Sequence, residues 1–213
     1  MAEVRVAPGE GERRAQRGYV RQYESSAAAI YAALDRNELL WVGLADRTAG
    51  IADDVVLGFA DRVVGHQFKT SQFSETFTLR TLLMGKDGLL KPLVAAWQSL
   101  KSVHPNQTIE IHLVTNDIPS TNDKVGSNPA DHSAAFLAEF EQHPRRTLEE
   151  WRATRWWNFM DDLRQASCLA KDFEQFLFGF RLLYGSAADF VQLHRLSPEG
   201  ARLSEKIAKL LPK

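Results

Sequence analysis

The residues best suited to chemistry lie in residues 51–69, where two adjacent acids precede one β-branched run and a Gln-Phe-Lys triplet ends the next. Asp53 and Asp54 stand before the first run, residues 60–62 turn the chain, and the second run ends in Gln67-Phe68-Lys69. Short β-branched runs joined by a tight turn are typical of a β-hairpin. The sequence therefore predicts a hairpin with acids at its start and an amide and an amine at its end.

Spacing on the second strand predicts how these side chains meet. Residues two apart on a strand face the same way, so Gln67 and Lys69 project together while Phe68 faces the opposite way. With the turn near Asp61, the two acids lie across from the end of the returning strand. Carboxylate and carbonyl oxygens suit Mg²⁺ or Mn²⁺, and a neighbouring lysine can position water and stabilise charge on a phosphate. These are the parts required to hydrolyse a phosphodiester.

Several segments, in chain order, also resemble a nuclease family. The D…Q-x-K arrangement on a hairpin is similar to the PD-(D/E)XK signature, in the Q-x-K variant of Mrr-type restriction endonucleases. As a set, the segments resemble the double-stranded-DNA endonuclease domain at the N-terminus of bacterial anti-phage effectors, namely CBASS nuclease effectors and antiviral STAND NTPases. The resemblance spans residues 12–120 and rests on residues 17–22 (RGYVRQ), 53–56 (DDVV), 67–71 (QFKTS) and 111–116 (IHLVTN).

The resemblance implies a restriction-endonuclease-like α/β core, a mixed central sheet flanked by helices. The helical pattern of the residues that follow predicts a C-terminal helical subdomain. It also implies catalytic and metal-binding residues: Asp54, with Asp53 as the competing choice, and Gln67 or a nearby main-chain carbonyl would bind Mg²⁺ or Mn²⁺, and Lys69 would position the attacking water. Glu24 is a further candidate for the catalytic and metal site, because some such enzymes use an acid of the first helix. The alternative for Glu24 is an ordinary exposed glutamate.

Two points of the family pattern are left open by the sequence. Many members carry a glutamate a few residues before the metal aspartate, whereas the corresponding stretch here, residues 44–47, offers only Asp46. Gln22 lies in the shared Gly-Tyr-x-x-Gln segment, where it either makes a structural bond near the site or takes part in catalysis.

By resemblance, the expected function is metal-dependent cleavage of double-stranded DNA by the effector domain of an anti-phage defence protein. Such effectors are held inactive until their oligomeric state changes, so a homo-oligomer is expected when active, with a sensor or NTPase region attached or associated. Two alternatives stay open. One is a catalytically silent scaffold that keeps the nuclease fold and binds protein or nucleic acid, and the other is a nuclease for RNA or single strands.

Composition is that of an ordinary globular protein, with 213 residues, 44% hydrophobic and 25% charged. No apolar run is long enough to cross a membrane and no signal peptide is recognisable, so we expect a cytoplasmic protein without membrane contact. The single cysteine, Cys168, excludes internal disulfides and is predicted to be buried. The net charge of −1 argues mildly against nonspecific nucleic-acid binding, although arginines cluster at residues 13–21 and 145–155.

Hydrophobic periodicity predicts the remaining elements and a division into a flexible N-terminus (1–11), a nuclease-like core (12–120) and a helical subdomain (121–213). A helix over 17–36 is expected to pack through Tyr19, Tyr23, Ala27, Ile30, Tyr31 and Leu34. The other predicted elements are a strand at 39–44, a short helix or turn at 79–83, a helix at 89–103, a strand at 108–115, a polar loop at 116–133, and helices at 133–142, 148–162, 169–184, 187–194 and 198–211.

Overall fold

The computed structural model describes residues 10–70, 74–169 and 171–185, with side chains from residue 22 onward. The elements, in chain order, are α1 (Glu10–Asp35), β1 (Trp41–Gly43), the 3₁₀ helix η1 (Arg47–Ala52), β2 (Val55–Gly58), β3 (Arg62–Phe68), β4 (Thr76–Phe77), the π-helical turn η2 (Arg80–Met84), α2 (Leu90–Val103), β5 (Thr108–Thr115), β6 (Ile118–Pro119), α3 (Ser133–Gln142), α4 (Leu148–Arg152), α5 (Trp157–Ser167), α6 (Phe173–Gly179) and β7 (Phe180–Tyr184).

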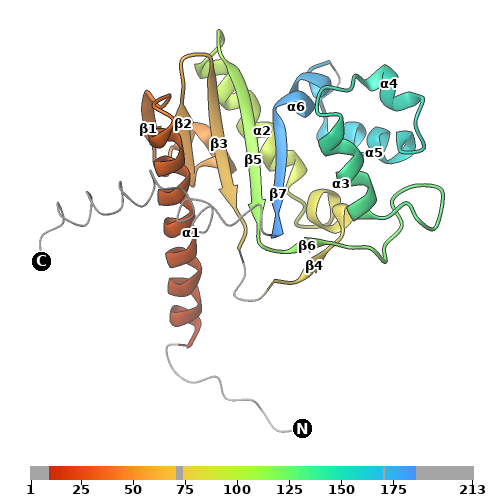
Figure 1. Ribbon diagram of the computed structural model, residues 1–213, viewed down its shortest axis with the longest axis horizontal. Helices are drawn as coiled ribbons and strands as arrows, with labels where there is room; N and C mark the ends of the chain where they lie inside the picture. Colours follow the sequence, from red (N-terminus) through yellow and green to blue (C-terminus); the bar gives the residue numbers. More distant parts are fainter. Residues whose placement is uncertain (1–9, 71–73, 170, 186–213) are drawn as a thin grey trace, which may run out of the picture.

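A mixed sheet forms the centre of the described fold, with five strands in the order β1-β2-β3-β5-β7. The first three strands form an antiparallel meander, and β5 and β7 then add in parallel to β3. Figure 1 shows β3, β5 and β7 ending at the same edge of the sheet. Because the hairpin register pairs Val55 with His66, the start of β2 also lies at this edge. The predicted mixed α/β class is confirmed at this level.

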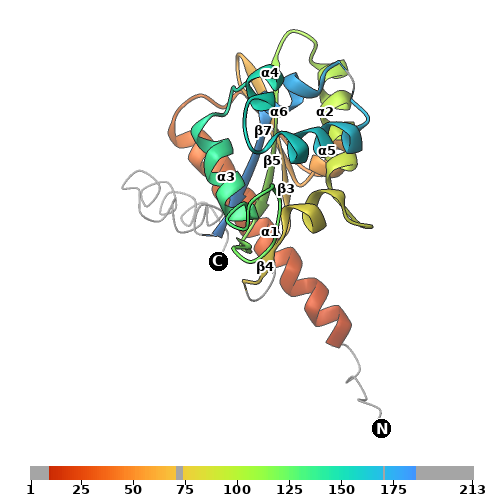
Figure 2. The same cartoon turned by 90° about the vertical axis from the view of Figure 1, so that its right-hand side faces the viewer.

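Helices cover both faces of the sheet, and each face has its own apolar core. One core lies between α1 and one face of strands β2, β3 and β5. It contains Ala33, Val55, Leu57, Val64, Phe68 and Val114. The other joins the opposite face to α2, α3, α5 and α6 and contains the large aromatics (Figures 1 and 2). Trp151 and Trp156 are each only 1% exposed, so both belong to this core.

The packing face of α1 differs from the prediction. Tyr23 is 68% exposed and Leu34 is 46% exposed, while the buried positions of the helix are the small residues Ser25, Ser26, Ala28, Ala29 and Ala33. These residues also recur at three- and four-residue spacing, so the helical period was right. Of the predicted packing residues, Ile30 lies against the core, Tyr23 and Leu34 do not, and the side chain of Tyr19 lies outside the described residues. The helix therefore meets the sheet through small side chains.

The C-terminal half of the described chain contains the largest secondary-structure error. Residues 169–184 were predicted as one helix, but the chain forms α6 and then β7, which pairs with β5 from Ile111–Phe180 to Thr115–Tyr184. The sheet therefore extends past residue 120, beyond the segment predicted to contain it. The helices predicted at 187–194 and 198–211 and most of the flexible N-terminus lie outside the described residues, and α1 already begins at Glu10.

Three smaller predictions in this half were also wrong. The helix predicted over 148–162 is two helices, because Thr154 Oγ1 donates to the Trp151 carbonyl at 2.8 Å and ends α4. Cys168 is exposed, since it takes a left-handed conformation (φ 59°) where α5 ends. The polar loop predicted at 116–133 contains strand β6, and its later part is held by Asp131, whose carbonyl accepts from the Val125 N–H at 2.7 Å.

Gly179 is expected to be sensitive to any side chain, because α6 approaches β5 closely there. A Cβ at this position would stand 2.2 Å from the Ile109 carbonyl oxygen, far inside van der Waals contact. We expect Gly179→Ala to lower the free energy of unfolding by about 1–3 kcal/mol through forced backbone shifts. Gly43→Ala is the control in urea denaturation, since its nearest neighbour is a side-chain atom of Asp46 at 3.2 Å. Equal losses in both variants would contradict this account.

Candidate active site

Asp54 is placed at the sheet edge by the turn from η1 into β2. Its carboxylate accepts three hydrogen bonds: Oδ2 accepts from Gln67 Nε2 at 2.6 Å and from the Phe68 backbone N–H at 2.7 Å, and Oδ1 accepts from Gln22 Nε2. The acid and the end of β3, predicted to face one another, are therefore in direct contact. The hairpin register explains this, because Val55 pairs with His66 and leaves Asp54 beside the next two residues of β3.

Burial governs the charge of Asp54. Partial removal from water raises the pKa of its carboxyl above the ordinary value of 3.8, and the nearby Asp53 carboxylate raises the pKa further. The Phe68 N–H and the Lys69 ammonium act in the opposite direction, but they do not cancel the effect of burial. Asp54 thus takes up a proton at a higher pH than an exposed aspartate does.

Gln67 supplies the second polar group. Its side chain is only 6% exposed, and its Nε2 donates both to Asp54 Oδ2 and to the Phe68 carbonyl oxygen, the latter at 3.2 Å. A carboxylate oxygen and a main-chain carbonyl oxygen therefore converge on one point, which an amide N–H now fills. Rotation of the amide about its last bond would bring the Gln67 carbonyl oxygen toward the same point. This donor set consists of oxygens and fits a hard divalent cation.

Lys69 follows directly on this strand. Its backbone N–H donates to the Val114 carbonyl at 2.8 Å, which extends the β3–β5 pairing by one step beyond Phe68. Phe68 itself packs into the α1-side core, as the predicted alternation requires. The Lys69 side chain is exposed and lies close enough to Asp54 to lower the pKa of that carboxyl. A cationic group therefore stands beside the acid and the amide.

The other acids proposed from the sequence have different surroundings. Glu24 is an exposed residue of α1, and the residue of this helix that bonds Asp54 is Gln22, two positions earlier. Gln22 was not among the predicted metal ligands, although the Gly-Tyr-x-x-Gln segment had drawn attention to it. Asp53 is half-buried beside Asp54 and caps the end of η1. Asp46 caps the start of η1, where it accepts from the Thr48 N–H at 2.9 Å and from the Thr48 hydroxyl at 2.7 Å.

His66, the immediate neighbour of Gln67, belongs to the opposite face of the sheet. Its ring stacks on Phe68 with centroids 6.0 Å apart and meets His112 edge-on at 4.9 Å. Complete burial, reinforced by His112, holds the pKa of His66 well below its usual value, so the ring is neutral near pH 7. Strand alternation thus directs the His66 side chain away from Gln67, its neighbour on β3.

The direction of the Asp54 shift leads to a prediction about pH. Removing the Lys69 ammonium by Lys69→Ala should raise the pKa of Asp54 further, and removing the neighbouring carboxylate by Asp53→Asn should lower it. The titration midpoint of Asp54 is expected to lie above pH 3.8 in the Lys69→Ala protein and closer to this ordinary value in the Asp53→Asn protein. Carboxyl ¹³C chemical shifts followed against pH give the order directly. A reversed order would show that the two charges do not act on Asp54 as stated.

Comparisons with known proteins give no guide to the role of this site. No protein-family model, curated protein or solved structure matches the chain. Within residues 10–70, 74–169 and 171–185, no group of three or more His, Cys, Asp or Glu side chains is arranged to hold a metal ion. The same residues contain no helix long and apolar enough to span a membrane.

Proposed function

We propose that this chain is a metal-dependent endonuclease that hydrolyses phosphodiester bonds of double-stranded DNA. The observation that carries the proposal is the contact of Asp54 with Gln67 beside Lys69, at the edge where β3, β5 and β7 end. Ligand sites in sheets with parallel strands are commonly formed at such carboxyl ends. The antiparallel meander β1-β2-β3 followed by α2 and a parallel strand agrees with the restriction-endonuclease-like order expected from the sequence.

Mg²⁺ or Mn²⁺ would be held by Asp54, by the Gln67 side-chain carbonyl after rotation of its amide, and by the Phe68 main-chain carbonyl. Asp53 stands close enough along the chain to contribute directly or through water. Glu24 would have to act through water, since Gln22 occupies the α1 contact with Asp54. When bound, such an ion neutralises charge on the phosphate and favours ionisation of a nearby water.

The protein side chains have separable roles in this proposal. Asp54 supplies the fixed negative charge, and Gln22 orients its carboxylate through Oδ1. Lys69, which is exposed and unobstructed by the core, positions the attacking water and stabilises the charge that grows on the phosphate oxygens. Gln67 is buried, and its amide lies within hydrogen-bond reach of both Asp54 and the Phe68 carbonyl.

The wider setting is proposed from the resemblance noted in the sequence. The chain would act in the cytoplasm as the effector domain of an anti-phage defence protein, together with an attached or associated sensor or NTPase region. Cleavage would depend on formation of a homo-oligomer. Activity of the isolated chain is therefore expected to rise steeply with protein concentration.

One observation favours a second candidate, a silent scaffold with the same fold. Both oxygens of Asp54 already accept hydrogen bonds from donors of this chain, so the cluster is satisfied without a cation. In a silent scaffold, the hydrogen bonds to Asp54 only hold α1 and the hairpin together. The two candidates differ in whether the cluster takes up metal.

Titration of Mn²⁺ into the purified protein separates them. The nuclease proposal expects one Mn²⁺ site, measured by calorimetry or by loss of the free-ion electron paramagnetic resonance signal, that disappears in Asp54→Asn. Asp46→Asn is the matched control, since Asp46 caps η1 and should leave Mn²⁺ binding unchanged. Absence of a site in the wild-type protein, or a site that survives Asp54→Asn, would overturn the assignment.

A further inference from the structure

A cavity of about 240 Å³ lies between α1 and the face of the sheet that this helix covers. It is lined by residues other than those of the candidate active site. The helix lines it at three- and four-residue spacing, with three small side chains and one charged one, Ala29, Ala32, Ala33 and Arg36. We call this space the α1 cavity.

The sheet wall of the α1 cavity is polar where a covered sheet face is ordinarily apolar. Strand β3, the central strand of the sheet, lines the cavity with Arg62, Val64 and His66, and the neighbouring β5 adds Glu110 and His112. Charged side chains and histidines are uncommon at covered positions, so their presence there is informative. The alanines of α1 opposite them leave open the space that larger side chains would fill. Space and convergent polar groups together are the features of a ligand site.

Glu110, the acid on this wall, is already engaged by the protein. His112 Nε2 lies 3.0 Å from Glu110 Oε2, and this hydrogen bond is the main cause that lowers the pKa of Glu110 below its ordinary value of 4.5. The charges of Arg181 and Arg62 lower this pKa further, against the effect of burial. Glu110 is therefore ionised near neutral pH and accepts the hydrogen bond from the His112 ring. Its charge is balanced without a cation from outside.

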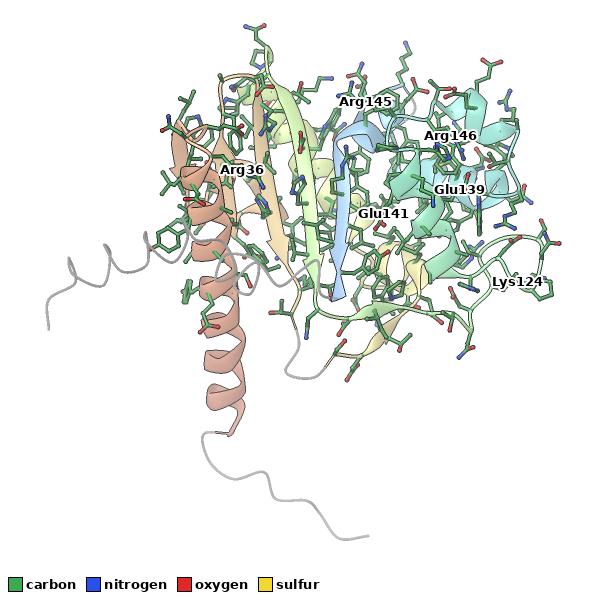
Figure 3. The ribbon with its side chains drawn as sticks, in the orientation of Figure 1. Arg36, Lys124, Glu139, Glu141, Arg145 and Arg146 are labelled. Atoms are coloured by element: carbon green, nitrogen blue, oxygen red, sulfur yellow. The ribbon has the colours of Figure 1, made fainter. Side chains whose placement is uncertain are left out.

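Two arginines give the α1 cavity its remaining charge. Arg36 is exposed, and within the described residues no ion pair or hydrogen bond engages its guanidinium. Figure 3 shows it at the end of α1 away from the edge where β3, β5 and β7 end. Arg62 lies over the Phe59 ring at 4.3 Å and pairs with the exposed acids Glu38 and Asp61, contacts that solvent weakens. Guanidinium groups in such positions suit a carboxylate or phosphate.

The floor of the α1 cavity is apolar, since Leu57, Phe59 and Val64 line it and are all buried. An apolar cavity of about 150 Å³ can admit benzene, so this larger space accommodates one ring with a charged substituent. We propose that the α1 cavity binds a small organic anion, with its apolar body on the floor and its oxyanion group on Arg36 and Arg62. The inference is independent of the nuclease proposal, because such binding can be measured without DNA or metal.

Benzoate is the probe, and benzyl alcohol and benzylamine are the neutral and cationic molecules of similar size. Ring ¹³C signals of labelled histidines locate the binding, since His66 and His112 line the cavity and His132 caps α3 elsewhere. We expect benzoate to shift the signals of the first two histidines and not that of His132, with a Kd on the order of 1 mM. Benzyl alcohol should bind about tenfold more weakly, because it forms no charge-assisted hydrogen bond, and benzylamine more weakly still.

Two substitutions separate the charge from the space. Arg36→Gln should weaken benzoate binding about tenfold and leave benzyl alcohol binding unchanged, since it removes the cation and keeps the floor. Ala32→Leu extends a side chain into the cavity from α1 and should abolish binding of both molecules, while thermal melting checks that the protein remains folded. Arg145→Gln is the control of equal charge, because Arg145 is exposed and lies far from α1 in Figure 3, and it should change neither affinity.

Three results would overturn the inference. The first is a wild-type protein whose His66 and His112 signals do not move at benzoate concentrations well above the expected Kd. The second is benzylamine that binds as tightly as benzoate, which would give the cavity the opposite charge preference. The third is an equal loss of benzoate affinity in Arg36→Gln and Arg145→Gln.

Discussion

Asp54→Asn should lower the rate of Mg²⁺-dependent cleavage of duplex DNA at least about 10²–10³-fold, the loss typical when one electrostatic element of an active site is removed. The substitution takes away the fixed negative charge that would hold the ion and leaves one oxygen acceptor in place. That acceptor can keep the bond from the Phe68 N–H, now 2.7 Å long, while Gln22 can turn its amide to accept from the new NH₂ group. The expected loss is therefore one of chemistry and not of folding.

The sign of the stability effect supports this separation. Because burial raises the pKa of Asp54, its carboxyl contributes stability below its ordinary pKa of 3.8, and this contribution is lost as pH rises through the raised pKa. Near pH 7 the ionised group is thus a net cost to the fold, which Asn removes. Thermal melting should show a stable Asp54→Asn protein, and Asp46→Asn should retain cleavage. Undiminished cleavage by Asp54→Asn would disprove the site assignment.

Phe176→Ala should lower the free energy of unfolding by about 3–5 kcal/mol, as expected for truncating a fully buried aromatic side chain. The ring joins α6 to both neighbouring layers: its centroid lies 6.2 Å from that of Trp97 on α2 and 5.5 Å from that of Phe180 on β7. Its exposure is 0%, so the truncation leaves a cavity inside the core. Urea denaturation followed by circular dichroism measures the effect.

Phe178→Ala is the matched control, because it removes the same ring two residues later on the half-buried side of α6. We expect a loss of about 1 kcal/mol there, in proportion to the smaller area withdrawn from water. Equal losses at the two positions would show that α6 does not pack against α2 and β7 in the way described.

Local signals were sufficient for the hairpin and its chemistry. The β-branched runs and the turn at residues 60–62 predicted β2 and β3, and strand alternation correctly separated Gln67 from Phe68. These features depend on period-two spacing within one short segment, which a sequence displays directly. Strand β5, predicted at residues 108–115, and helix α3, predicted at 133–142, were confirmed with the same bounds.

Features that depend on distant neighbours were not predictable in this way. Phe173, Phe176 and Phe180 keep a helical spacing across Gly179, so the change from α6 to β7 is hidden, and pairing with β5 decides it. The exposure of Cys168 follows from the left-handed end of α5 rather than from its apolar neighbours. On α1, the aromatic residues suggested the packing face, whereas the buried positions are alanines and serines.

The site residues show the same difference between local and distant contacts. Gln67 and Asp54 belong to one hairpin, so their contact could be anticipated from register alone. Gln22 is 32 positions from Asp54, and only the packing of α1 across the sheet brings the two together. Glu24 was the acid on the same helix, but a helix turns by about 100° per residue, so two positions place it on another side.

Incubation of the purified protein with supercoiled plasmid and Mg²⁺ or Mn²⁺, over a wide range of protein concentration, tests the central claim most directly. The account predicts nicked and linear DNA that increase steeply with protein concentration, disappear in EDTA, and disappear in a Lys69→Ala protein that melts like the wild type. Exposed Lys124, replaced by alanine in the control, should leave cleavage unchanged. Cleavage that persists in EDTA or in Lys69→Ala, or a plasmid that stays intact at every concentration while Mn²⁺ fails to bind, would contradict the nuclease assignment.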